Sequence, residues 1–161
     1  MREAEFWSDD GVFGLLLTGA IQEQLFARCE AAGSRETGCI LVGYYKRGNS
    51  LAVVTDLPET PDDSTAGPTS FDRGTKGLRK LLKRLWRTRR YYLGEWHYHP
   101  NVSPSASGQD HRQMRAIATD ERSRCPEPIL VIVGGAKLDW RLAAHVYPGG
   151  TPVALFERGT I

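Results

Sequence analysis

The stretch that most constrains this chain is residues 95–110, which contain two histidines, two prolines and an aspartate in close succession. The sequence that begins at Tyr91 predicts a strand, and side chains alternate in direction along a strand, so His97 and His99 would face one side and their aromatic neighbours the other. The two histidine Cα atoms would lie roughly 6.5–7 Å apart, which lets both imidazoles reach one metal ion. Pro100 is expected to end the strand just after the second histidine.

Asp110 is the candidate for a third ligand. Apolar residues after the Ser/Pro-rich turn recur at helical spacing, Met114 and Ile117 among them, which places Asp110 in the first turn of a helix. Two histidines and one carboxylate leave a tetrahedral zinc with one position for water, the arrangement of a catalytic rather than a structural site. Ser107 and Asp110 also have the spacing of a helix capping box, an interpretation that is compatible with metal binding.

This spacing carries a resemblance to a known family. The His-x-His-Pro sequence that begins at His97, followed after six residues by Ser107-x-x-Asp110, resembles the JAMM motif of the MPN/JAB metallopeptidases. The resemblance implies that His97, His99 and Asp110 hold one zinc ion per chain. It also implies that Ser107 stabilises the oxyanion of the reaction and that Glu36, at the start of an upstream strand, is the general base.

The candidate base opens a strand-like sequence. Residues 36–43 are similar to the family's Glu-x-x-Gly opening followed by apolar residues, with Gly38 and Cys39 in the reverse order of the commonest form. Glu95 would share the face of the motif histidines, so it is a second candidate for an acid beside the metal or a substitute base. Glu36 is preferred.

The two histidines outside the motif receive structural interpretations. His111 would point about 100° away from Asp110 around the helix, which places it at the surface or beside the ligands. His145 falls in a late strand and is expected to be a hydrogen-bonded structural residue.

Zinc chemistry suits the hydrolysis of an amide. A zinc ion lowers the pKa of its bound water to about 7 and polarises a carbonyl, so cleavage of a peptide or isopeptide bond is expected. A zinc deaminase would need a Pro-Cys-x-x-Cys pair of ligands, which the sequence at Cys125 does not supply.

A narrower resemblance lies outside the motif. Residues 71–78 and 91–97 look like the small JAMM proteins of bacterial anti-phage (CBASS) operons. Those relatives accompany a cGAS-like nucleotidyltransferase and an E1/E2-like conjugating protein, and they remove the nucleotidyltransferase's C-terminus from conjugated targets. The implied substrate is a protein with an extended C-terminal tail. The alternatives are a processing protease for a ubiquitin-like or sulfur-carrier protein and a catalytically inactive MPN scaffold, although this chain keeps the motif residues.

The composition sets the remaining limits. The 161 residues fit one domain, 1–161, and the net charge of +2 excludes a generally polycationic protein. Three cysteines, an odd number without paired spacing, favour buried thiols in a reducing compartment. No apolar run reaches the about 20 residues of a membrane span, so the protein is expected to be cytoplasmic, without a membrane partner.

Apolar periodicity predicts an α+β fold. Strands are expected at 12–18, 39–45, 51–55, 91–100, 129–133, 138–146 and 153–156, and helices at 21–33, at 73–90 and after 107. The second and third strands would form a hairpin. The prediction is a mixed, mainly antiparallel sheet flanked by three helices, in agreement with the MPN/JAB-like fold that the resemblance implies.

Two segments outside the motif concern substrates and partners. Residues 57–71 are rich in Pro, Asp, Thr and Ser, which is typical of a functional or mobile loop, and the resemblance implies that this segment clamps the tail of the substrate as an added strand. Residues 73–90 carry many Lys and Arg and no acid, so they predict a solvated helix face or a docking patch for an acidic partner, with Lys76, Lys80 and Lys83 as contacts. The near-neutral total and the lack of interleaved aromatic residues argue against nucleic acid.

Overall fold

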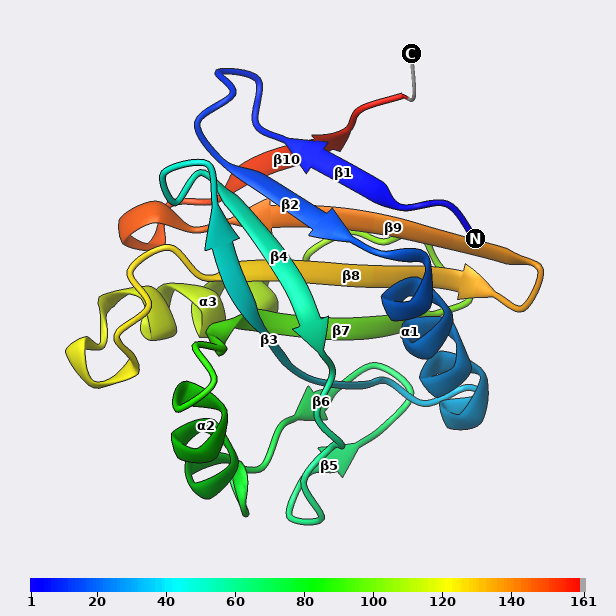
Figure 1. Cartoon of the computed structure of the whole chain (residues 1–161). Helices are drawn as coiled ribbons and strands as arrows, with labels where there is room; N and C mark the ends of the chain where they lie inside the picture. Colours follow the sequence, from blue (N-terminus) through cyan, green and yellow to red (C-terminus); the bar gives the residue numbers. More distant parts are fainter. Residues whose placement is uncertain (160–161) are drawn as a thin grey trace.

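The computed structural model describes residues 1–159 and contains one large sheet, a small two-stranded sheet and three α-helices (Figure 1). The elements are β1 (Ala4–Trp7), β2 (Gly14–Leu17), α1 (Gly19–Ala32), β3 (Thr37–Lys46), β4 (Leu51–Asp56), β5 (Thr65–Ala66), β6 (Phe71–Asp72), α2 (Leu78–Trp86), β7 (Tyr91–Pro100), α3 (Gly108–Thr119), β8 (Ile129–Ala136), β9 (Asp139–Val146) and β10 (Val153–Glu157). Two short 3-10 turns follow α3 and β9, at Glu121–Ser123 and Pro148–Gly150.

The large sheet has the order β1-β10-β9-β8-β7-β3-β4-β2, and β2 pairs in turn with β1. Its pairs are antiparallel except for β2 with β4 and β7 with β8. The parallel β7–β8 pair needs a crossover, which α3 supplies, whereas β3 and β4 form the expected hairpin. The prediction of an α+β fold with a mixed, mainly antiparallel sheet and three helices is confirmed.

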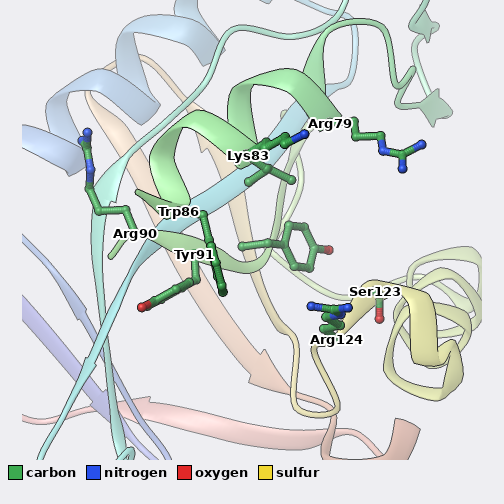
Figure 2. A pocket seen from close by; sticks show the side chains of 9 residues that line it. Arg79, Lys83, Trp86, Arg90, Tyr91, Ser123 and Arg124 are labelled. Carbon is green, nitrogen blue, oxygen red and sulfur yellow. The ribbon is translucent and has the colours of Figure 1, made fainter. Parts of the chain in front are cut away.

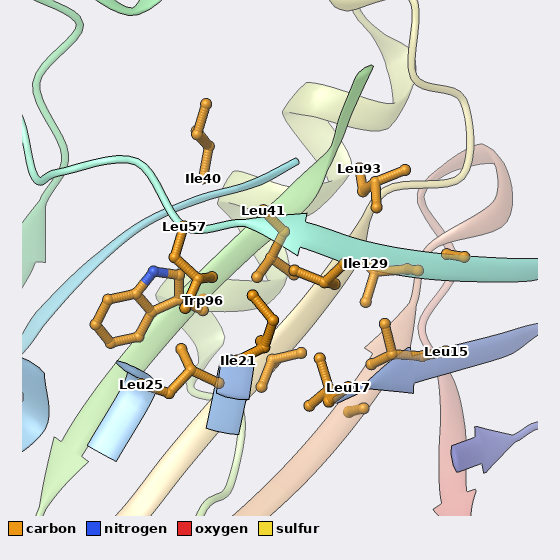
Figure 3. Close-up of a cluster of buried hydrophobic side chains, with 14 of the residues drawn as sticks. Leu15, Leu17, Ile21, Leu25, Ile40, Leu41, Leu57, Leu93, Trp96 and Ile129 are labelled. Atoms are coloured by element: carbon orange, nitrogen blue, oxygen red, sulfur yellow. The ribbon is translucent and has the colours of Figure 1, made fainter. Parts of the chain in front are cut away.

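The two faces of β7 have different roles. Trp96 is buried in the large core with Ile21 and Leu25 of α1 (Figure 3), and Tyr98 belongs to the same core. The histidines alternate with them and therefore face the other side, where Met114 of α3 packs on β8. The helices α1 and α3 thus cover opposite faces of β7 and β8 (Figure 1), and α3 lies on the face of the motif histidines.

Glycine at position 38 brings β3 close to the histidine strand. The register pairs Gly38 with His97 and Thr37 with Tyr98, and Glu36 is the residue just before this ladder begins. A Cβ atom at Gly38 would lie 2.2 Å from the carbonyl oxygen of Trp96 and 2.9 Å from the His97 ring. Only glycine permits this approach.

The basic segment differs from its prediction. The expected helix over 73–90 is shorter, because α2 spans Leu78–Trp86 only. Gly77, at its N-cap, has φ 81°, a left-handed conformation that stops the helix from continuing towards the N-terminus. The loop over 57–71 holds β5 and the start of β6, and β1 was not predicted.

Other expectations concern cysteines and membrane spans. Cys29, Cys39 and Cys125 are free and buried, as predicted, and burial raises the pKa of their thiols to about 12, about 11 and about 12, respectively. Among the helices of residues 1–159, none combines the length and the apolar character that crossing a bilayer requires.

Candidate metal centre and active site

The side chains of His97, His99 and Asp110 meet at one point, and all three are buried. One donor atom from each lies within 4.8 Å of the others. His97 Nδ1 is 2.7 Å from one carboxylate oxygen of Asp110, and His99 Nε2 is 3.3 Å from the other. Two imidazoles and a carboxylate gathered at such distances are a donor set that fits a divalent metal ion.

The fold accounts for this convergence. The histidines come from alternate positions of β7, where His97 pairs with Ile132 of β8. Ile132 and Met114 belong to one buried cluster, which fixes α3 against the sheet and directs its first turn at the histidines. Asp110 lies in that first turn, as the sequence predicts.

Electrostatics keep the third candidate ligand ionised. Burial acts to raise the pKa of the Asp110 carboxyl, but hydrogen bonds with His97 and His99 and with the Ser107 N–H outweigh burial and hold this pKa far below its usual range. The hydrogen bond with Asp110 raises the pKa of His99. Asp110 is therefore a ready anionic ligand, whereas protons compete for His99 more strongly than for an ordinary histidine.

Ser107 caps α3 next to the candidate ligands. Its hydroxyl oxygen accepts a hydrogen bond of 3.1 Å from the Asp110 N–H, and its own N–H donates to the Asp110 carboxylate at 2.7 Å. The expected capping box is thus confirmed. The hydroxyl acts as an acceptor in this motif and the residue is exposed, so its O–H remains able to donate to another group.

Glu36 immediately precedes β3, whose first residue, Thr37, pairs with Tyr98 of the histidine strand. The half-buried carboxyl of Glu36 has a pKa raised by burial, which His99 opposes and the negative charge of Asp110 reinforces. The backbone N–H of Glu36 donates to the carbonyl oxygen of Gly67 at 2.8 Å, so the 57–71 segment holds the candidate base in place.

Phe71 packs against the candidate metal centre, a role that the sequence did not predict. The Phe71 ring meets the His97 ring edge to face, with centroids 5.9 Å apart, and is itself buried. Thr60 adds a hydrogen bond of 2.8 Å from its hydroxyl to the carbonyl oxygen of Gly38. The 57–71 segment therefore forms one wall of the site. The signal in the sequence was that Phe71 begins the 71–78 stretch of the narrower resemblance.

The second candidate acid is fully engaged elsewhere. Glu95 is buried, and its carboxylate accepts hydrogen bonds from the Arg73 guanidinium and, at 2.7 Å, from the Tyr92 hydroxyl. Arg73 was expected in the basic helix but lies before it and donates to the carbonyl oxygen of Gly74 as well. Glu95 thus anchors the 57–71 segment to β7 through Arg73.

Replacing Glu95 by glutamine should lower the free energy of unfolding by about 3 kcal/mol, because Arg73 would keep a largely buried charge without its counter-charge. Urea unfolding measures this loss. The control is Glu59→Gln, which removes an exposed ion pair with Arg28 and should cost at most about 1 kcal/mol. An equally stable Glu95→Gln protein without activity would make Glu95 the better candidate base.

The remaining histidines form a cluster behind α3. The Nδ1 of His111 is 2.9 Å from the hydroxyl oxygen of Tyr147, and the His111 ring meets the His145 ring edge to face. The Nδ1 of His145 is buried without a hydrogen-bond partner in residues 1–159, so the prediction of a hydrogen-bonded structural residue is wrong for this atom. Burial lowers the pKa of His145, which favours the neutral ring.

Comparisons with known proteins show which families and structures this chain is similar to. The family described as prokaryotic homologs of the JAB domain matches residues 19–143. A "CD-NTase/cGAS isopeptidase" of Enterobacter hormaechei is 40% identical over 159 residues, which cover 98% of this chain and 88% of that protein. "Probable metalloprotease y4qB" of Sinorhizobium fredii is 28% identical over 127 residues, covering 76% of this chain and 77% of that protein.

One solved structure has a similar fold. The solution structure of protein DSY2949 from Desulfitobacterium hafniense matches with a TM-score of 0.64 and 17% identity, over 91% of this chain and 90% of that one. At this identity the likeness concerns the fold alone.

Proposed function

Because the chain belongs to the family of prokaryotic JAB-domain homologues, we propose that it is a zinc-dependent isopeptidase that cleaves after the C-terminal tail of a conjugated protein. The observation that carries this proposal is the buried group of His97, His99 and Asp110, with Ser107 hydrogen-bonded to Asp110 and Glu36 just before the strand that pairs with the histidine strand. The curated relative named as an isopeptidase of CD-NTase/cGAS supports a cGAS-like nucleotidyltransferase as the conjugated protein.

Each residue of the site would have a separate role in hydrolysis. The zinc ion that His97, His99 and Asp110 would hold supplies an acidified water and a polarised carbonyl. The Glu36 carboxylate would accept the proton of the attacking water and pass it to the leaving amine. The Ser107 hydroxyl would donate its hydrogen to the oxyanion as the carbonyl becomes tetrahedral.

The 57–71 segment is the candidate to hold the tail of the substrate. Both residues of β5 are exposed, so this small sheet could accept an extended tail as a further strand beside the wall formed by Phe71. The connection between α3 and β8 is short, with one 3-10 turn at Glu121–Ser123. It offers little surface for a second folded protein, which favours recognition of a tail.

Cleavage of defined fusions tests this function. The C-terminal tail of a nucleotidyltransferase encoded beside this gene is fused to a reporter, and cleavage is compared with that of a ubiquitin fusion and of casein. We expect cleavage of the first substrate only, its loss in a zinc chelator and its return with added zinc. Equal cleavage of all three would indicate a general peptidase, and preference for ubiquitin a processing protease. No cleavage by a zinc-loaded protein would favour the inactive scaffold.

Zinc affinity should depend on pH through His99. The pKa of His99 is raised in the metal-free protein, so protons compete with zinc at a higher pH than for an ordinary histidine, whose pKa is about 6.5. We expect affinity to fall by about tenfold per pH unit below the raised pKa and to level off above it. Competition with a chromophoric chelator across this range measures the effect. Affinity that stays constant down to pH 6.5 would contradict it, because a raised pKa requires the fall to begin above that value.

A further inference from the structure

A hollow with a volume of about 380 Å³ lies at the far end of β7 from the candidate metal centre. Its floor is apolar and aromatic, formed by Leu82 and Trp86 of α2 and by Tyr91 and Tyr92 of β7. Trp86 is 64% exposed and meets the Tyr91 ring edge to face, with centroids 6.4 Å apart. A large aromatic side chain left open beside a hollow is typical of a binding site.

The rim of the hollow is positively charged. Arg79 and Lys83 extend from α2 on one side, and Arg124 lies across from them, next to Ser123 (Figure 2). None of these three cations forms an ion pair within residues 1–159, and none of the described lining residues is acidic. Arg90 also lines the hollow but is paired with Asp56 at 2.6 Å.

This arrangement favours one kind of ligand. An apolar floor fits one large apolar side chain, and a rim of unpaired cations fits carboxylates on either side of it. The cations are spread around the floor (Figure 2), whereas recognition of a phosphate gathers donors at one point. Trp, Tyr and Arg are also the residues that contribute most to protein interfaces.

We propose that this hollow is a docking site for an acidic protein segment that carries one large apolar side chain. It lies about 20 Å along β7 from His97, the length of six strand residues, so one substrate can occupy both sites. The inference builds on the proposed isopeptidase function: the hollow would hold the body of the substrate while its tail enters the metal centre. Of the lysines expected to contact an acidic partner, only Lys83 lines the hollow.

Peptide binding tests the hollow independently of catalysis. The probe is a fluorescein-labelled peptide in which Glu and Asp surround one Phe, and binding is followed by anisotropy. We expect binding that weakens with salt, by about tenfold when Phe is replaced by Ser, and by about tenfold when the acids are replaced by Gln. His97→Ala should bind equally well, so a failure of the proposed isopeptidase function leaves this result unaffected.

Variants of α2 provide a matched comparison. Arg79→Glu/Lys83→Glu should weaken peptide binding by more than tenfold, and Trp86→Ala by roughly thirtyfold. Arg84→Glu/Arg87→Glu makes the same charge change on exposed residues of the same segment outside the hollow, and should have a much smaller effect. On a cleaved conjugate, the hollow variants should raise KM with little change in kcat.

Three results would overturn the proposal. The first is no binding of the acidic peptide to the wild-type protein. The second is an equal loss in the two double variants, which would indicate only the general charge of the segment. The third is tighter binding of ATP or of single-stranded oligothymidine, which would assign the hollow to nucleotides, since their bases could stack on Trp86.

Discussion

Replacing Glu36 by glutamine is expected to lower kcat by about 10³- to 10⁴-fold while leaving zinc content and substrate affinity unchanged. Glutamine has nearly the shape of glutamate but cannot accept the proton of the attacking water. The backbone N–H of residue 36 would keep its hydrogen bond to Gly67, so the local structure should persist. Single-turnover cleavage of the fusion substrate, with metal analysis of the same sample, measures the effect.

Glu59→Gln is the matched control for this experiment. It makes the same chemical change in the neighbouring segment, at an exposed carboxylate that pairs with Arg28. Its kcat should remain within a factor of about two, because a surface ion pair contributes little. If Glu36→Gln retained a tenth of the wild-type kcat or more, Glu36 would not be the general base.

Asp110→Ala is expected to remove both the metal and all measurable activity. Asp110 contacts both histidines and has a depressed pKa, so it supplies the only negative charge within the proposed ligand group. Its loss should also reduce stability by about 1 kcal/mol, because it closes the capping box of α3. Metal analysis and thermal unfolding with and without chelator measure the two effects. A chelator should lower the Tm of the wild type but not of the variant.

Ser107→Ala separates capping from metal binding. It removes the hydroxyl that caps α3 but leaves His97, His99 and Asp110 in place. We expect a similar loss of stability, full zinc content, and a kcat lower by about 10²- to 10³-fold, because an oxyanion donor is lost. Loss of zinc in Ser107→Ala would mean that the metal depends on the cap, and full zinc in Asp110→Ala would remove Asp110 from the ligand group.

The parts of the site that could be predicted are those set by local geometry. The alternating side chains of β7 and the capping box of α3 depend on residues close in sequence. The two-residue period of a strand and the Ser-x-x-Asp spacing were therefore sufficient to predict them. The link between Glu36 and the motif came from a resemblance, and the pairing of β3 with β7 supplies its structural basis. The prediction that His97, His99 and Asp110 bind zinc remains to be tested by metal analysis.

The parts that could not be predicted depend on contacts between distant residues. From the sequence, Arg73 is one more cation of a basic helix. Its ion pair with the buried Glu95 becomes apparent only in the structure. The left-handed conformation of Gly77 shortened that helix. Trp86 follows the leucines of the basic segment at helical spacing, yet it is exposed, because a nine-residue helix buries only part of its apolar surface. No periodicity distinguishes such residues from those that pack inside.

The position of Glu36 in the chain has a consequence for the order of assembly. His97 and Asp110 are separated by 13 positions, so closing the metal centre costs little chain entropy, whereas Glu36 must be brought in from 61 positions upstream of His97 by the pairing of β3 with β7. Under the proposed function, proton transfer would therefore require the pairing of β3 with β7, whereas the ligand group depends on the packing of α3 against β8.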